Sequence, residues 1–196
     1  MDESMTTNNL RMYYTRMLTP IGELTIAGES EVLRFIYFPT GKMTARPEPH
    51  WEEAERGVVR ETVQQLDAYF ARKLRAFDLP LGPQGTDFQK EVWRELERIA
   101  YGETISYGEL ARRIGNPAAS RAVGLANGRN PIPIVIPCHR VIGSNGKLTG
   151  FGGGLPVKES LLALEARQAV LTELPRRRAD PASRADQADW KPVRWN

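Results

Sequence analysis

The stretch Pro137-Cys138-His139-Arg140-Val141 combines the only cysteine of the chain with one of its two histidines. A cysteine attacks as its thiolate, and a pKa of about 8.5 leaves only a small fraction ionised at neutral pH. A base must therefore take the proton, and His139 follows the cysteine directly in the sequence. We predict that Cys138 is a nucleophile, although a free cysteine is commonly buried as a small apolar residue.

The geometry of this pair depends on the local backbone. Neighbouring side chains on an extended segment point to opposite sides, so Cys138 and His139 interact only at a turn or through a bridging water. Pro137 makes an irregular turn plausible. A catalytic base usually needs an orienting group. Two carboxylates on the expected last helix qualify, and we favour Glu165 over Glu159 because Glu165 lies on the apolar face of that helix.

Two units must position these residues, and the first spans residues 10–82. It reads as a small sheet with one helix, because alternating and helical apolar patterns succeed each other there. The expected elements are a strand from Tyr13, a hairpin of strands 22–27 and 32–38, a helix over 52–73 and an edge strand over 77–81. His50 lies in a polar loop and is interpreted as a surface histidine. Residues 1–9 are expected to be disordered.

The second unit, residues 83–169, reads as mainly helical. A capping box at Thr86 opens its first helix, a second box at Ser106 opens a short helix, and Asn116 is expected to cap a third over 117–126. The two short helices predict a helix-turn-helix. After them the sequence predicts a strand over 132–136, a wing-like turn over 143–147, a helix from 155 and a flexible polar tail over 170–196.

The charge distribution of this second unit points to a polyanionic partner. No Asp or Glu occurs from Ala111 through Lys158, whereas that span holds seven cations: Arg112, Arg113, Arg121, Arg129, Arg140, Lys147 and Lys158. A sustained basic segment is typical of a nucleic-acid surface. The third helix is rich in small residues, which allow close approach to DNA or tight internal packing. Arg121 is its one long cation and could enter a groove or replace an extruded base.

Composition excludes several classes of protein. A single cysteine rules out an intramolecular disulfide and makes a structural zinc site very improbable, and no segment has the spacing of a calcium loop. The N-terminal segment lacks the basic start and apolar core of a secretion signal. No apolar run approaches the roughly 20 residues that span a bilayer. We therefore expect a cytoplasmic protein without metal or membrane association.

At this point the residues resemble a known family. The segment IPCHRVIGSNGKLTGFGGGLPVKESLLALE is similar to the active-site signature of the O6-alkylguanine-DNA alkyltransferases, and ISYGELARRIGNPAASRAVGLANGRNP resembles their helix-turn-helix. The start TPIGELTIAG is similar to their N-terminal region. The resemblance implies an α+β fold. It consists of a small RNase H-like sheet-plus-helix domain followed by a helical, winged helix-turn-helix-like domain that carries the active site.

The resemblance also implies roles for individual residues. Cys138 corresponds to the alkyl acceptor, His139 to a base acting through water, Glu165 to its orienting group and Asn130 to the residue that holds the preceding turn.

Phe151 stands where many relatives have tyrosine, so stacking on a base is kept and a hydroxyl is lost. The other substrate-binding positions are Tyr107, the backbone of Val141 and Cys138, and the N–H of Gly152. The DNA-binding positions are Arg121 as the finger that fills the stack, with Ser106, Ala119, Ala122 and Gly124.

The implied activity is DNA repair. The protein would bind duplex DNA through the minor groove, flip out O6-alkylguanine and transfer the alkyl group irreversibly to Cys138. It would thus be a methylated-DNA–protein-cysteine S-methyltransferase that is consumed in one turnover. The implied partner is double-stranded DNA with O6-alkylguanine, and O4-alkylthymine is left open as a further substrate. No cofactor is expected. We expect a monomer, and cooperative assembly on DNA is left open.

Two other functions compete with this one. A non-catalytic winged-helix DNA-binding protein would explain the helix-turn-helix and the basic segment, but it would leave Cys138 and His139 idle. A cysteine hydrolase would need a separately placed histidine, and the other one is His50 in a loop. Transfer of a labelled alkyl group from DNA to the protein distinguishes the three.

Overall fold

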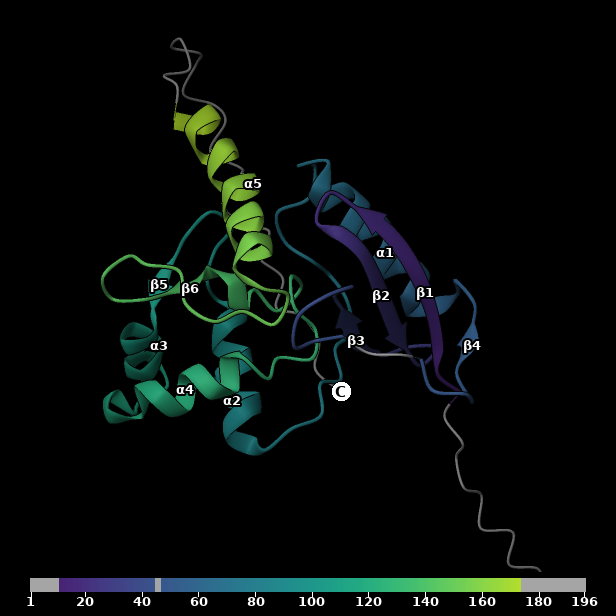
Figure 1. The fold of residues 1–196 in the computed structure, drawn as a ribbon, viewed down its shortest axis with the longest axis horizontal. Coiled ribbons are helices and arrows are strands. Elements are labelled where there is room, and N and C mark those ends of the chain that lie inside the picture. The colour runs from purple at the N-terminus through teal and green to yellow at the C-terminus, as the bar shows by residue number, and fades with distance from the viewer. Residues whose placement is uncertain (1–10, 45–46, 174–196) are drawn as a thin grey trace, which may run out of the picture.

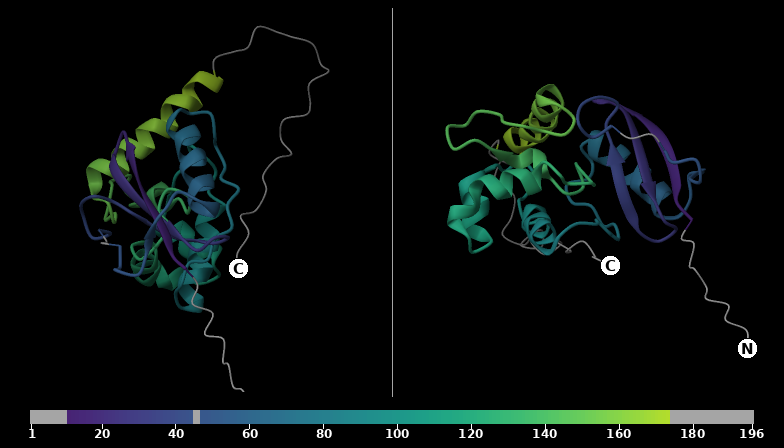
Figure 2. Two further views of the ribbon diagram at one scale, coloured as in Figure 1. Left: turned by 90° about the vertical axis from the view of Figure 1, so that its right-hand side faces the viewer. Right: turned by 60° about the horizontal axis from the view of Figure 1, so that its bottom comes forward.

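The computed structural model describes residues 11–44 and 47–173, with side chains up to residue 166. The predicted disorder of residues 1–9 lies outside this range. Figure 1 shows a sheet with one helix at one side of the molecule and a helical unit at the other. The right-hand view of Figure 2 shows the same division. This α+β arrangement confirms the predicted fold class.

The N-terminal sheet has four strands in the order β3-β2-β1-β4. Strands β1 (Tyr13–Thr19), β2 (Gly22–Gly28) and β3 (Leu33–Tyr37) form an antiparallel meander, which confirms the predicted hairpin. Alternate residues such as Leu24 and Ile26 are buried against the helix α1 (Gly57–Phe70). The predicted helix start at Glu52 is wrong, because β4 (Glu52–Glu53) pairs in parallel with the beginning of β1.

The outer edge of β3 is covered by two other segments. Leu33 N–H donates to the carbonyl of Pro80, and Gly82 N–H donates back to the carbonyl of Leu33. The predicted edge strand over 77–81 is therefore reduced to a single bridge at Leu81. Further along, Ile36 N–H donates to the carbonyl of Pro131 at 2.9 Å. This bond joins the sheet directly to the segment that leads to Cys138.

The helical unit contains the predicted helix-turn-helix. Helix α2 (Asp87–Glu97) begins with the reciprocal capping box of Thr86, as predicted. Helix α3 (Tyr107–Arg113) is capped by Ser106, whose hydroxyl accepts from the N–H of Glu109, so only half of the second predicted box forms. A 3-10 turn η1 (Pro117–Ala119) precedes helix α4 (Ser120–Asn127), and Asn116 makes no side-chain cap. That predicted cap was wrong.

The predicted strand over 132–136 is instead a buried turn. Ile134 has a φ of 76°, which extended backbone does not allow. The side chain of Asn130 stabilises this turn, because its amide donates to the carbonyl of Ile136 at 2.8 Å and its oxygen accepts from Ile132 N–H at 3.0 Å. Asn130 is completely buried. β-branched residues favour strands, but here these two hydrogen bonds and burial decide the backbone.

The wing and the last helix complete the unit. Strand β6 (Val141–Ile142) pairs in parallel with β5 (Ile105–Ser106), and the turn over 143–147 follows as predicted. Helix α5 (Leu155–Glu173) begins where the sequence predicted. It continues four residues beyond the expected start of the tail, and residues 174–196 lie outside the described range. The buried apolar residues of both units form one contiguous core.

Candidate active site

Cys138 begins a single 3-10 turn, η2 (Cys138–Arg140). Its N–H donates to the carbonyl of Ile136 at 2.8 Å, and Arg140 N–H donates to the carbonyl of Pro137 at 3.0 Å. The backbone therefore bends at the cysteine, which is the turn that Pro137 made plausible. Cys138 is 3% exposed. Its thiol is thus buried, and its carbonyl accepts from the side-chain amide of Asn127 in α4 at 3.5 Å.

The surroundings of Cys138 keep its thiol protonated at neutral pH. Burial raises the pKa of Cys138 to about 11, although a hydrogen bond from Asn130, the charge of Lys158 and the backbone N–H groups of Cys138 and His139 lower it. The thiolate is thus costly in the resting protein. Any nucleophilic role of Cys138 requires a base that accepts the proton.

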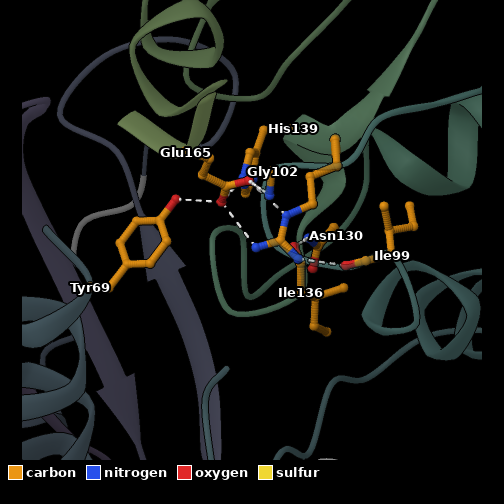
Figure 3. A network of polar contacts seen from close by, with 8 residues as sticks. Tyr69, Ile99, Gly102, Asn130, Ile136, His139 and Glu165 are labelled. Atoms are coloured by element: carbon orange, nitrogen blue, oxygen red, sulfur yellow. Dashed lines mark hydrogen bonds and ion pairs between the residues drawn. The ribbon is translucent and has the colours of Figure 1, made fainter. Parts of the chain in front are cut away.

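Glu165 is the centre of a buried polar network, shown in Figure 3. Its Oε1 accepts from Tyr69 Oη at 2.8 Å, from His139 Nε2 at 2.9 Å and from Arg140 Nη2 at 2.9 Å. Its Oε2 accepts from the N–H of Gly102 at 3.1 Å and from Arg140 Nε at 3.0 Å. Burial raises the pKa of Glu165, but the contacts with His139 and Arg140 outweigh it, and the pKa is lowered overall. Glu165 is therefore a carboxylate.

The ionised carboxylate fixes the tautomer of His139. Since Glu165 can only accept, Nε2 of the neutral imidazole carries the proton and Nδ1 carries the lone pair. Nδ1 is buried and has no hydrogen-bond partner within the described part of the chain. Burial lowers the pKa of His139; Glu165 raises it, and the charges of Arg140 and Lys158 lower it further. The net effect is a lowered pKa, so His139 is a neutral base at physiological pH.

Glu159, the rival orienting residue, is exposed on α5 and does not enter this network. The sequence preference for Glu165 thus agrees with the contacts. Two other residues near the site were misjudged from the sequence. Arg140 and Lys158 were counted among the cations of a DNA-facing segment, yet they are 5% and 0% exposed. Arg140 neutralises Glu165, while Lys158 Nζ donates to the carbonyls of Val141 at 2.6 Å and Thr149 at 2.9 Å.

Lys158 could have been identified from helical periodicity. It lies seven residues before Glu165, and residues two turns apart share a helix face. Both side chains are accordingly buried: Glu165 contacts His139 and Arg140, and Lys158 contacts the backbone just after the η2 turn. Burial lowers the pKa of Lys158, and the nearby Cys138 thiolate would raise it. The ammonium group is suited to stabilise negative charge on that sulfur.

The residues predicted to bind the substrate come from α3, from the strand after Cys138 and from the glycine-rich segment before α5. Tyr107 is half-buried at the start of α3, and Lys158 Nζ lies 5.9 Å above the centre of its ring. The carbonyl of Val141 already accepts from Lys158. Phe151 is half-buried and packs against Phe38 of the N-terminal unit, with ring centroids 5.4 Å apart. Gly152 is buried, and its carbonyl accepts from the N–H groups of residues 42 and 43, so the N-terminal unit supports this wall.

The proposed DNA contacts lie on and near α4. Arg121 and Ala122 are exposed, and Ala119 and Ser106 are half-exposed. Gly124 is half-buried, and a Cβ atom added there would lie 3.7 Å from the ring of Tyr107. Sequence patterns did not single out Leu125, which is 67% exposed one turn after Arg121. The remaining basic residues of the segment are exposed at Arg112, Arg129 and Lys147, and Arg112 and Arg113 pair with Glu109.

Two further observations concern metals and membranes. Among the side chains of residues 11–44 and 47–166, no three His, Cys, Asp or Glu gather as metal ligands do. Within the same ranges, no helix has the length and apolar character that crossing a bilayer requires.

Comparison with known proteins identifies the family. The family model described as "6-O-methylguanine DNA methyltransferase, ribonuclease-like domain" matches residues 12–83, and that described as "6-O-methylguanine DNA methyltransferase, DNA binding domain" matches residues 87–167. Together they cover well over half of the chain. The chain belongs to the 6-O-methylguanine DNA methyltransferase family.

Individual relatives agree with this assignment. A methylated-DNA–protein-cysteine methyltransferase of Methanosarcina acetivorans is 55% identical over 154 residues, covering 79% of this chain and 98% of the relative. The protein of the same name from Mycobacterium tuberculosis (strain H37Rv) is 51% identical over 159 residues, covering 81% and 94%. The crystal structure of Mycobacterium tuberculosis OGT in complex with DNA matches with a TM-score of 0.74 and 51% identity, covering 80% of this chain and 94% of that one.

Proposed function

We propose that this protein repairs O6-alkylguanine in duplex DNA by moving the alkyl group to Cys138 Sγ, and that each molecule acts once. The observation that carries the proposal is that Glu165 fixes the imidazole of His139, and that His139 follows the buried Cys138 directly in the same 3-10 turn. Membership of the family gives the substrate class. A regulator without chemistry would have no use for such an arrangement.

The reaction needs a defined path for protons and electrons. The Cys138 proton passes through a water molecule to Nδ1 of His139, and Glu165 and Arg140 stay paired behind the imidazolium. The sulfur lone pair attacks the alkyl carbon, and the carbon–O6 bond breaks with its electron pair on the guanine oxygen. The guanine anion then takes up a proton from solvent water and becomes an ordinary base, and the imidazolium releases the cysteine proton to solvent. Lys158 offsets the negative charge of the thiolate during this step.

The alkylated protein has no route back to the thiol. A thioether lacks a good leaving group, so the sulfur keeps the alkyl group and the molecule is consumed. A free thiol also requires a reducing surrounding, which supports the proposal that the protein acts in the cytoplasm.

A flipped base is required because O6 is inaccessible inside the duplex. We propose that α4 docks in the minor groove, that Arg121 fills the vacated position in the stack, and that Tyr107, Phe151 and the wall around Gly152 hold the extruded guanine. The exposure of Arg121 and Ala122 on one helix supports this docking. The division of labour follows the two units, with residues 83–169 carrying the DNA surface and the acceptor and residues 10–82 supporting them.

The test uses duplex DNA with O6-[methyl-³H]guanine. The wild-type protein should take up label in a burst that ends at one methyl group per protein molecule. The Cys138→Ala variant should bind the same DNA and take up none. Label on Cys138→Ala would exclude Cys138 as the acceptor. Continued turnover by the wild type would exclude the proposal that each molecule acts once. Binding of the wild type to DNA without any transfer would favour the non-catalytic alternative.

A further inference from the structure

Tyr69 connects the N-terminal unit to the polar network of the C-terminal unit. It lies in the last turn of α1, is completely buried, and donates from its hydroxyl to Glu165 Oε1 at 2.8 Å. The two residues are 96 positions apart in the chain. Figure 3 shows the tyrosine hydroxyl directed at the carboxylate from the side opposite to His139.

We propose that Tyr69 is a positioning residue for alkyl transfer, which fixes the Glu165 carboxylate and thereby the basicity and orientation of His139. This inference rests on the proposed function and deepens it. It makes the chemistry of the C-terminal unit depend on an N-terminal residue that touches neither the thiol nor the DNA surface.

The geometry gives Tyr69 two effects on Glu165. First, Oε1 receives three donors, from Tyr69, His139 and Arg140, which occupies the oxygen fully and prevents rotation of the carboxylate. Second, the hydroxyl draws electron density that would otherwise strengthen the bond to His139. The ring is itself held in place, because it packs at 5.5 Å from Phe77 and 6.0 Å from Tyr101.

The protonation states suit these effects. Burial and the charge of Glu165 raise the pKa of Tyr69, so its hydroxyl remains a donor throughout the physiological range. The charged or titratable groups around His139 come from each neighbouring element: Cys138 and Arg140 on η2, Lys158 and Glu165 on α5, Tyr69 on α1 and Tyr101 after α2.

Removing only the Tyr69 hydroxyl leaves more negative charge for His139 to interact with. The imidazolium form then becomes more stable, and the pKa of His139 rises. Since the reaction needs neutral His139, activity is present above this pKa and lost below it. The acidic limb of the pH profile should therefore move to higher pH. A tyrosine that served packing alone would leave that limb in place.

The experiment compares the full-length wild type with Tyr69→Phe and, as matched control, Tyr14→Phe. Tyr14 is a tyrosine of the same unit whose hydroxyl donates to Glu53 at the surface. Single-turnover transfer from O6-methylguanine DNA is followed between about pH 5.5 and 8.5, together with the ¹⁵N chemical shifts of His139. We expect transfer by Tyr69→Phe to be roughly tenfold slower near neutral pH, as for a lost bond to a charged group.

In Tyr69→Phe, the acidic limb and the His139 titration should both move to higher pH, while Tyr14→Phe should match the wild type. An unchanged rate and pH profile in Tyr69→Phe would overturn the inference. A slower rate with an unmoved limb and unmoved His139 shifts would also overturn it, because that pattern indicates a structural role. If the wild type accepted no label, the proposed function would fail, and the His139 shifts would still decide whether Tyr69 tunes the imidazole.

Discussion

Arg140 donates two parallel hydrogen bonds to Glu165, from Nε to Oε2 at 3.0 Å and from Nη2 to Oε1 at 2.9 Å. Such fork geometry is the strongest form of arginine–carboxylate pairing. The pair is buried on both sides, so each charge depends on the other. Because Arg140 offsets the charge of Glu165, the carboxylate does not hold His139 in its charged form, and Lys158 adds a second positive charge that favours the neutral imidazole.

Glu165→Gln should therefore destabilise the protein and slow transfer. The substitution leaves Arg140 buried without its counter-charge, which costs about 3 to 5 kcal/mol. It also removes the group that fixes the His139 tautomer, and transfer should slow by roughly 100-fold. Urea unfolding and single-turnover kinetics measure the two effects. Glu159→Gln, on the exposed side of the same helix, should stay within about 0.5 kcal/mol of the wild type.

Stability should fall on acidification in two stages. The folded state holds the pKa of His139 below 6.5 and that of Glu165 below 4.5. Groups with lowered folded pKa values stabilise the protein above their unfolded pKa values, and this contribution is lost as the pH falls. Thermal unfolding should thus show a decrease in Tm below about pH 6.5 and a steeper one below about pH 4.5. The Tm of His139→Gln should not show the decrease that begins at the higher pH. If that decrease persisted in the variant, a titratable group other than His139 would be its cause.

The Cys138 thiol should react slowly with simple alkylating reagents. With its pKa raised to about 11 by burial, the free protein at neutral pH contains far less thiolate than an ordinary cysteine provides. Each pKa unit corresponds to a tenfold change in thiolate fraction. The iodoacetamide rate should rise about tenfold per pH unit up to the pKa. Protein unfolded in urea supplies the reference, and equal rates in both states at neutral pH would contradict the raised pKa.

Asn130→Ala should weaken the turn before the cysteine. The variant loses both hydrogen bonds of a completely buried side chain, which leaves Ile132 N–H unpaired and leaves the Ile136 carbonyl with the N–H of Cys138 as its remaining partner. An unpaired buried group costs about 1 to 3 kcal/mol. Chemical unfolding should show the loss, and transfer should slow because Cys138 is displaced. A variant as stable as the wild type would show that the turn is held by other contacts.

Arg121→Ala should reduce base extrusion without altering the fold. Arg121 is exposed on α4, so its removal leaves the core intact. Duplexes carrying 2-aminopurine next to the lesion report the extruded state by fluorescence, and we expect the extruded population to drop roughly tenfold. Arg60→Ala removes an equally exposed cation from α1 and serves as the control. If Arg60→Ala lowered the extruded population as much as Arg121→Ala, general electrostatic attraction to DNA would explain the effect, and the specific role of Arg121 would be excluded.

Local patterns predicted much of this structure. The capping box at Thr86, the hairpin, the wing turn and the start of α5 all follow from residue preferences over a few positions. Glu165 could be identified because helical periodicity places it on an apolar face. These features depend on short-range rules, so a single sequence was sufficient for them.

Long-range contacts were not accessible in this way. Tyr69 has the spacing of an ordinary core residue in an amphipathic helix, and no local signal links it to Glu165. The chain 132–136 has the composition of a strand, but Asn130 and the surrounding core impose a turn with Ile134 in the left-handed region. Arg140 and Lys158 were misplaced because cations are usually exposed, and only the buried carbonyls and carboxylate that they contact explain their burial.

The hydrogen bond from Ile36 N–H to the Pro131 carbonyl has a consequence for solubility. Together with the bonds at Leu33, it occupies the free side of β3, where an unprotected strand would offer its backbone to other molecules. The segment that leads to the reactive cysteine thus also closes the sheet against intermolecular pairing.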